Sequence, residues 1–373
     1  MSKEERLLVD LFKSAGVEIN GNEPHDPQVY DKKFYKRVLS QAALGLGESY
    51  LDGWWDCKAL DQFFERILRA KLEKKVKGNW KIALHVLKAQ LINLQKPSRA
   101  YQVGEKHYDL GNDLYIAMLD KRLNYACGYW RNASNLDDAQ EAKLELVCKK
   151  INLQPGMKVL DLGCGFGAFT GFAAEKYGVE VTGVSVSKRQ VDLASERYKD
   201  LPVNFLLEDY RNVKGKYDCV VSIGLMEHIG YKNHRTYMEV VNRKLNEKGL
   251  SFIQTIGNNE SQTTTNAWTA KYIFPNSLVP SIAQIGKAME GLFAMEDWHN
   301  FGPDYDRTLM AWYDNFERAW PSLKTRYDDR FYRMWRYYLL CSAGGFRARY
   351  TQLWQIVMSR EGAQQPVCRF SAP

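Results

Sequence analysis

The sequence predicts an α/β fold in which helices cover both faces of a parallel, doubly wound sheet. A glycine turn, Gly163-Cys164-Gly165-Phe166-Gly167, follows a short apolar run at 159–162 and precedes a helix that starts near Ala168. Strand and helix patterns then alternate along the chain, as they do in α/β proteins. The length of 373 residues, with 45% hydrophobic content, is enough for two domains.

Residues 1–98 are expected to form a smaller, mostly helical domain. A short helix is predicted before residue 21, and Pro24-His25-Asp26-Pro27 marks a turn. The stretch 45–56, G-L-G-E-S-Y-L-D-G-W-W-D, combines glycines, acids and two adjacent tryptophans more densely than a generic helix needs. A packed turn with both tryptophans in the core is the simplest interpretation.

Basic residues dominate residues 66–99, where ten lysines and arginines face one acid, Glu73. Apolar residues recur beside this charge at helical spacing, at Leu84, Leu87, Leu91 and Leu94. Such a helix suits an anionic lipid surface, and it equally suits a solvated helix docked on the body of the protein. Pro97-Ser98 ends the segment and marks the predicted domain boundary.

The second domain, residues 99–373, carries the alternating pattern. Strands are predicted at 159–162, 179–186, 203–207, 217–223 and 249–255, and helices at 139–151, 187–199 and 233–245. From Trp268 onward the chain becomes helical and rich in aromatic residues. Those rings indicate either core or the wall of a long apolar cavity.

The glycine turn has the spacing of a nucleotide-binding loop, and its neighbours favour one cofactor. Dinucleotide folds usually carry an acid about twenty residues past the first glycine, where this chain has Ser185. Asp161 precedes the first glycine, and Glu208-Asp209-Tyr210 ends the third strand, where adenosylmethionine-dependent enzymes hold adenine. This pattern favours adenosylmethionine over NAD, so a dehydrogenase is the poorer interpretation.

Nearly the whole chain resembles the cyclopropane-fatty-acyl-phospholipid synthases. The generic part of the resemblance is the glycine turn, and its most specific parts are N-Y-A-C-G-Y-W (124–130) and E-D-W-H-N-F-G (296–302). The other matching motifs are G-L-G-E-S-Y-L-D-G-W-W-D (45–56), H-Y-D-L-G-N-D-L (107–114), G-L-M-E-H-I-G (224–230), K-Y-I-F-P-N (271–276) and F-R-A-R (346–349). The resemblance implies a seven-stranded Rossmann-like methyltransferase sheet with a helical, aromatic-rich C-terminal insertion or lid.

The resemblance also implies the reaction. The family passes a methyl group from adenosylmethionine to the cis double bond of a phospholipid acyl chain, and the resulting carbocation closes to a cyclopropane. A bound bicarbonate ion is taken to be the base. Its ligands in the family match Cys127, Glu227, Ile256 and Tyr305, whereas Gln254 stands where the family has histidine. Glutamine cannot take up a proton near neutral pH, so a methyl-branched or methylene-bearing product is the alternative.

For the cofactor, the resemblance implies contacts along the sheet edge. Asp161, Gly163, Gly165 and Gly167 are expected at the methionine end, and Ser185 with Gln190 at the ribose. The adenine and sulfonium ends are expected at Asp209, Tyr210 and Tyr125.

The remaining predictions concern partners and location. Met1–Phe12 is charged rather than signal-like, and no apolar run reaches membrane-spanning length, so we expect a cytoplasmic protein bound peripherally to an anionic membrane. The resemblance implies a homodimer. Seven scattered cysteines suggest free thiols and no metal site. A nucleic-acid methyltransferase would also suit the net charge of +8, but the Asn/Asp-Pro-Pro-aromatic motif of many such enzymes is absent.

Overall fold

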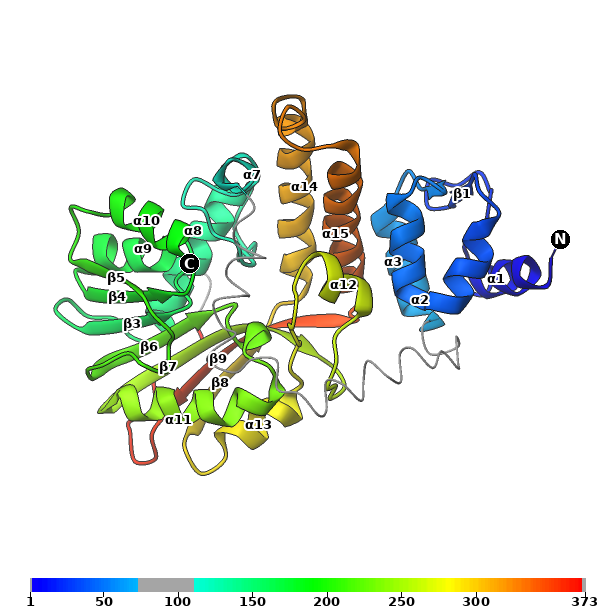
Figure 1. Cartoon of the computed structure of the whole chain (residues 1–373). Coiled ribbons are helices and arrows are strands. Elements are labelled where there is room, and N and C mark those ends of the chain that lie inside the picture. Colours follow the sequence, from blue (N-terminus) through cyan, green and yellow to red (C-terminus); the bar gives the residue numbers. More distant parts are fainter. Residues whose placement is uncertain (1, 73–110, 371–373) are drawn as a thin grey trace. The chain divides into compact units, whose positions relative to one another are not determined.

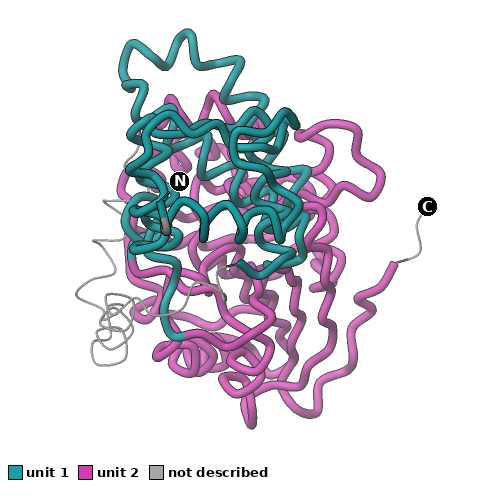
Figure 2. The backbone as a smooth tube through the Cα atoms, turned by 90° about the vertical axis from the view of Figure 1, so that its right-hand side faces the viewer, with its two compact units in different colours: residues 1–92, 263–275, 305–351 teal, residues 93–262, 276–304, 352–373 magenta. Residues whose placement is uncertain are grey.

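The computed structural model describes residues 2–72 and 111–370, which fall into two compact units (Figure 1, Figure 2). One unit combines the N-terminal helices with residues 263–275 and 305–351, and the other contains the large sheet. The predicted boundary at residue 98 lies outside the described residues. So do residues 73–99 of the basic segment and residues 107–110 of the H-Y-D-L-G-N-D-L motif. Within the described ranges, no helix has both the length and the hydropathy to cross a bilayer.

The large sheet has seven strands in the order β5-β4-β3-β6-β7-β9-β8. Its first five strands are parallel neighbours, and β8 pairs antiparallel with β9. The strands are β3 (Lys158–Leu162), β4 (Glu180–Ser185), β5 (Val203–Leu207), β6 (Tyr217–Ile223), β7 (Leu245–Asn258), β8 (Ala294–Asn300) and β9 (Thr351–Ser359). The predicted strands are confirmed, whereas β8 and β9 were not located from the sequence.

Helices cover both faces of this sheet (Figure 1). Because side chains alternate along a strand, Leu160 and Leu162 face one core and Val159 faces the other. The first core is closed by α11 and α13, and the second by α8 and α9. The helices of this unit are α7 (Asn112–Met118), α8 (Leu136–Lys150), α9 (Ala168–Tyr177), α10 (Lys188–Arg197), α11 (His234–Lys244) and α13 (Ile282–Met289), with 3₁₀ turns η1 (Met226–His228) and η2 (Tyr231–Asn233).

The other unit is mainly helical. Helix α15 packs along α3 and also against α2, and a two-stranded antiparallel sheet joins β1 to β2. Its elements are α1 (Lys3–Lys13), β1 (Gln28–Val29), α2 (Lys33–Leu51), β2 (Trp55–Asp56), α3 (Leu60–Arg69), α12 (Ala267–Tyr272), α14 (Pro303–Leu323) and α15 (Asp329–Arg347).

The glycine- and tryptophan-rich stretch 45–56 is only partly the turn that the sequence suggested. Its first seven residues lie in α2, where the glycines allow neighbouring groups to pack closely. A Cβ on Gly45 would come 2.3 Å from the Arg37 carbonyl oxygen, and one on Gly47 would come 2.3 Å from the Trp268 ring. Trp55 is fully buried, as predicted for a core residue, while Trp54 is half-buried beneath the Arg37 guanidinium.

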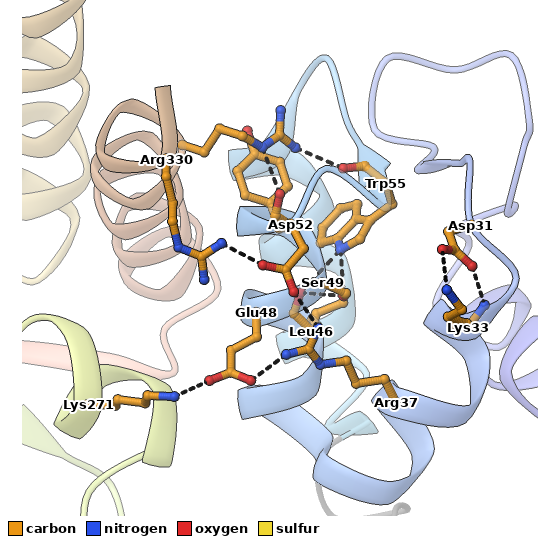
Figure 3. A network of polar contacts seen from close by, with 12 residues as sticks. Asp31, Lys33, Arg37, Leu46, Glu48, Ser49, Asp52, Trp55, Lys271 and Arg330 are labelled. Atoms are coloured by element: carbon orange, nitrogen blue, oxygen red, sulfur yellow. Dashed lines mark hydrogen bonds and ion pairs between the residues drawn. The ribbon is translucent and has the colours of Figure 1, made fainter. Parts of the chain in front are cut away.

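An ion-pair network fixes this stretch within its unit (Figure 3). The nearly buried carboxylate of Glu48 accepts hydrogen bonds from Arg37 at 2.5 Å, from Tyr272 at 3.0 Å, and from Lys271. Burial opposes the charged form, but these hydrogen bonds outweigh it and hold the pKa of Glu48 below its ordinary value. Asp52 joins the network by pairing with both Arg37 and Arg330.

Replacing Glu48 by alanine should destabilise this unit, because Arg37 and Lys271 both lose their shared carboxylate. We expect a loss of about 2–3 kcal/mol in the free energy of unfolding, measured by urea denaturation at pH 7. Glu239→Ala is the matched control, since Glu239 forms an exposed pair with Arg235 and should cost no more than about 0.5 kcal/mol. Equal losses for the two variants would contradict this assignment.

Candidate active site

The glycine turn leaves β3 at the carboxyl edge of the sheet and leads into α9. Gly163, Gly165 and Gly167 have φ values of 78°, 55° and 78°, a region that favours glycine. The N–H groups of Gly163 and Cys164 donate to the Val184 carbonyl at 2.9 and 3.0 Å, which ties the turn to β4. A Cβ on Gly167 would lie 2.7 Å from the Phe205 ring, whereas Gly165 faces open space. The backbone at Gly165 is therefore accessible to a ligand.

Asp161 lies under this turn with only 2% of its surface exposed. Its carboxylate accepts a hydrogen bond from the Thr170 hydroxyl on α9 at 2.8 Å. Burial raises the pKa of Asp161 to about 7, and the Thr170 hydrogen bond and the charge of Lys143 act in the opposite direction. Its charge at neutral pH therefore depends on its neighbours.

The predicted ribose pair is brought together at the end of β4. The Ser185 hydroxyl and Gln190 Oε1 are 3.0 Å apart, and both side chains are buried. Ser187 caps α10 by accepting from the Gln190 N–H at 3.5 Å, which explains why Gln190 on the helix reaches Ser185 on the strand.

The predicted adenine and sulfonium residues are half-buried or buried near other aromatic side chains. Asp209 is paired with Arg211 through both carboxylate oxygens, at 2.7 and 2.6 Å. Tyr210 packs on Tyr237, and within the described part of the chain its buried hydroxyl makes no hydrogen bond. Tyr125 makes an edge contact with Tyr115, whose ring also lies 5.5 Å from Phe166 in the glycine turn.

Glu227 is the most unusual acid of this edge. It lies in η1 with 7% exposure, and its Oε1 accepts a 2.6 Å hydrogen bond from the Ile256 N–H at the end of β7. Its Oε2 is buried and has no hydrogen-bond partner among the described residues. Burial raises the pKa of Glu227 to about 7, against hydrogen bonds from Ile256, its own N–H and Thr255. The second oxygen is available to a ligand.

Gln254 joins Cys127 to the sheet. Its Nε2 donates to the Cys127 carbonyl at 3.4 Å, and its Oε1 accepts from Gln355 Nε2 on β9 at 3.0 Å. The Cys127 thiol is buried and points to the Gly128 carbonyl at 3.1 Å. The contact that Cys127 makes with Gln254 is therefore made by its backbone, in agreement with an interpretation that gives its sulfur no nucleophilic role.

Tyr305 belongs to the other compact unit. Its ring lies 4.6 Å from Phe346 and 6.0 Å from Trp312, measured between centroids. The structure thus brings Glu227 to Ile256 and Cys127 to Gln254, while Tyr305 lies in an aromatic cluster of its own.

Three polar residues that act on the predicted site were not selected from the sequence. Thr170 and Gln355 contact it by hydrogen bonds, and the charge of Lys143 acts on Asp161. A signal existed for two of them. Gln355 interrupts the otherwise apolar run of β9, and Lys143 falls on the buried side of α8. Thr170 gives no such signal, because its role depends on the turn that places α9 beside Asp161.

Comparison with known proteins identifies lipid-modifying relatives. A sequence profile for mycolic acid cyclopropane synthetase matches residues 95–356. The cyclopropane-fatty-acyl-phospholipid synthase of Escherichia coli K12 is 49% identical over 355 residues, covering 95% of this chain and 93% of that enzyme. Tuberculostearic acid methyltransferase UfaA1 of Mycobacterium tuberculosis is 30% identical over 386 residues, covering 95% and 88%. The solved cyclopropane synthase MmaA2 from M. tuberculosis superposes with a TM-score of 0.67 at 26% identity, over 72% of this chain and all of that one.

Glu227→Gln should make the protein more stable at alkaline pH while it removes the acid. The pKa of Glu227 rises on folding, so ionising it destabilises the folded state as pH increases from about 4.5 to above 7. Glutamine keeps an acceptor for the Ile256 N–H. We expect the variant to exceed the wild type in free energy of unfolding by about 2–3 kcal/mol at pH 8, with little difference at pH 4.5, by urea denaturation. A constant difference across this range would refute the raised pKa.

Proposed function

The chain belongs to the cyclopropane synthase family of adenosylmethionine-dependent methyltransferases, and on that premise we propose its substrate, its product and its site residues. It transfers the methyl carbon of adenosylmethionine to the cis double bond of an unsaturated acyl chain in a membrane phospholipid, and a cyclopropane ring closes. The observation that carries this proposal is the 49% identity to the E. coli enzyme along 95% of this chain.

Adenosylmethionine would lie across the carboxyl edge of the parallel strands, where such sheets bind ligands. The accessible backbone at Gly165 suits the methionine end, together with Asp161 if that carboxylate is ionised. Ser185 and Gln190 offer a hydroxyl and an amide to the ribose. The unpartnered Tyr210 hydroxyl suits the adenine side, whereas Asp209 would have to share its carboxylate with Arg211.

The reaction makes two demands on the protein. An alkene is a weak nucleophile, so its carbons must be held in line with the methylsulfonium group at near-attack distance. The carbocation that results must be protected from water until a proton leaves the transferred methyl group. Aromatic faces stabilise a cation without attacking it. We assign this function to the C-terminal aromatic residues, among them Tyr305 with Phe346 and Trp312.

The residues around Glu227 fit a small anion that also carries a proton. When bound, bicarbonate would supply the base that removes the methyl proton. The buried Glu227 Oε2 has a free lone pair for a hydroxyl donor, and Gln254 has a second N–H beyond the one given to Cys127. We therefore propose Glu227, Gln254, Ile256 and Cys127 as residues that hold it. Tyr305 is included in this proposal from the family resemblance alone.

Gln254 stands where the family pattern has histidine, and this difference bears on which product forms. Its amide is already bonded to Cys127 and Gln355, so it orients an anion by hydrogen bonding but exchanges no proton near neutral pH. With no proton acceptor at position 254, the transferred methyl group would lose its proton more slowly. The competing product is a methyl-branched or methylene-bearing chain.

The product decides between these outcomes. Purified protein, adenosylmethionine and vesicles of unsaturated phosphatidylglycerol should yield fatty acids 14 mass units heavier, with the high-field proton signals of a cyclopropane ring in NMR. Gln254→His should raise the rate of ring closure, by up to about 100-fold, the lower end of what a positioned proton acceptor contributes. An acyclic major product from the wild type would refute the cyclopropane assignment.

We further propose that the protein is cytoplasmic, binds the membrane surface peripherally and forms a homodimer. The proposed membrane binding rests on the ten basic residues at 66–99, whose attraction to anionic lipid is screened by salt, and the homodimer is proposed from the family resemblance. Activity on anionic vesicles should fall at least about fivefold between 0.05 and 0.5 M NaCl, while neutral vesicles give little activity at either concentration. Equal activity on both vesicle types at both salt concentrations would contradict it.

A further inference from the structure

Helix α8 buries two long polar side chains next to the Tyr125–Cys127 loop, and neither takes part in the steps proposed above. Lys143 is 1% exposed and Gln140 is fully buried, one turn apart on a face that also carries the core residues Leu144 and Val147. A buried ammonium group is costly unless it is paired and hydrogen-bonded. The groups that surround Lys143 therefore indicate its role.

The first neighbour of Lys143 is the loop that carries Tyr125 and Cys127. Lys143 Nζ donates to Asn124 Oδ1 at 2.6 Å, and Asn124 in turn donates its side-chain amide to Asp120 at 2.9 Å and its backbone N–H at 2.7 Å. Asp120 and Asn124 are each 4% exposed. A carboxylate, an amide and an ammonium group thus form one buried chain at the start of the loop.

The same helix holds the loop at two further points. Gln140 donates to the Ala126 carbonyl at 2.7 Å, and the Tyr129 N–H donates to the Ala139 carbonyl at 2.8 Å. A Cβ on Gly128 would lie 3.0 Å from the Ala139 Cβ, so loop and helix are in close contact there. Successive contacts from α8 thus fix the backbone on either side of Cys127, whose carbonyl meets Gln254.

The second neighbour of Lys143 is the cofactor side of the site. Its charge acts on Asp161 beneath the glycine turn, as well as on Asp120, Cys127 and Cys148. The other titratable groups that interact with Asp161 are Cys164 in the turn and Tyr237 on α11. Among the described residues, the charge of Lys143 favours the ionised form of Asp161, while burial lowers the pKa of Lys143 itself to about 8.

We propose that Lys143 is a positioning residue for methyl transfer, which orders the Tyr125–Cys127 loop through its hydrogen bond to Asn124. This inference rests on the proposed placement of the sulfonium end of adenosylmethionine at Tyr125. Lys143 contacts neither substrate nor cofactor in this role. Its removal should therefore weaken cofactor binding through the loop.

Binding of S-adenosylhomocysteine, measured by calorimetry at pH 7, tests this role. Lys143→Met should weaken binding by at least about tenfold, because the loop loses the charge-assisted hydrogen bond that reaches it through Asn124. Lys143→Gln keeps an N–H for Asn124 and removes the charge. It should weaken binding less, by about threefold, and it keeps the test informative if the methionine variant does not fold.

Lys150→Met is the matched control. Lys150 lies on the same helix, is fully buried and pairs with Asp297 at 2.9 Å. This variant should lower the melting temperature as much as Lys143→Met, yet bind S-adenosylhomocysteine within about twofold of the wild type. Wild-type affinity in each Lys143 variant that folds would overturn the inference alone, whereas a wild type that binds no S-adenosylhomocysteine would overturn the proposed cofactor site with it.

Discussion

The parallel pairing of β3 with β4 and β6 is the constraint on which the site depends. Parallel strands end at the same edge of a sheet, so residues far apart in sequence meet there. In this sheet Leu162 is level with Val184 and with Ser222, and Ile223 is level with Gln254. The glycine turn, the Ser185–Gln190 pair and Gln254 therefore follow from one register. A slip of one residue would turn each side chain to the opposite face.

The second constraint is the burial of charge at that edge. Asp161 and Glu227 are nearly inaccessible, and burial raises the pKa of each to about 7. A fold selected for stability alone would not need them, because buried acids destabilise the folded state once they ionise. The two acids differ in their partners. Asp161 has a hydroxyl and a nearby lysine charge, whereas Glu227 has one committed oxygen and one that is open to a ligand. Perturbed acids of this kind are typical of functional sites.

Much of this arrangement could be predicted from the sequence, because local patterns encode it. The strands at 203–207 and 217–223 were predicted to the residue from their apolar runs, and Ser187 marks the start of α10. The glycine turn is likewise local. It connects β3 to α9 through positive φ angles that glycine adopts without strain.

The remainder depends on contacts between distant segments, which carry no local signal. Strands β8 and β9 lie in a part of the sequence whose charged and aromatic residues are typical of helices. In the described sheet β9 pairs with β7 and with β8. The Gln254–Gln355 hydrogen bond spans 101 positions and follows from that pairing. Gly45 and Gly47 suggested a turn, but in the structure they allow close packing against Arg37 and Trp268. In each case tertiary packing decided between two locally acceptable conformations.

The central claim is that one sheet edge holds adenosylmethionine and a small anion beside the buried acid Glu227. A crystal structure of the protein with S-adenosylhomocysteine and bicarbonate tests it most directly. We expect the nucleoside at Ser185 and Gln190, and a planar three-oxygen anion in contact with Glu227 Oε2. A nucleoside bound away from the glycine turn, or a Glu227 that still contacts no ligand in crystals of active protein, would contradict the account.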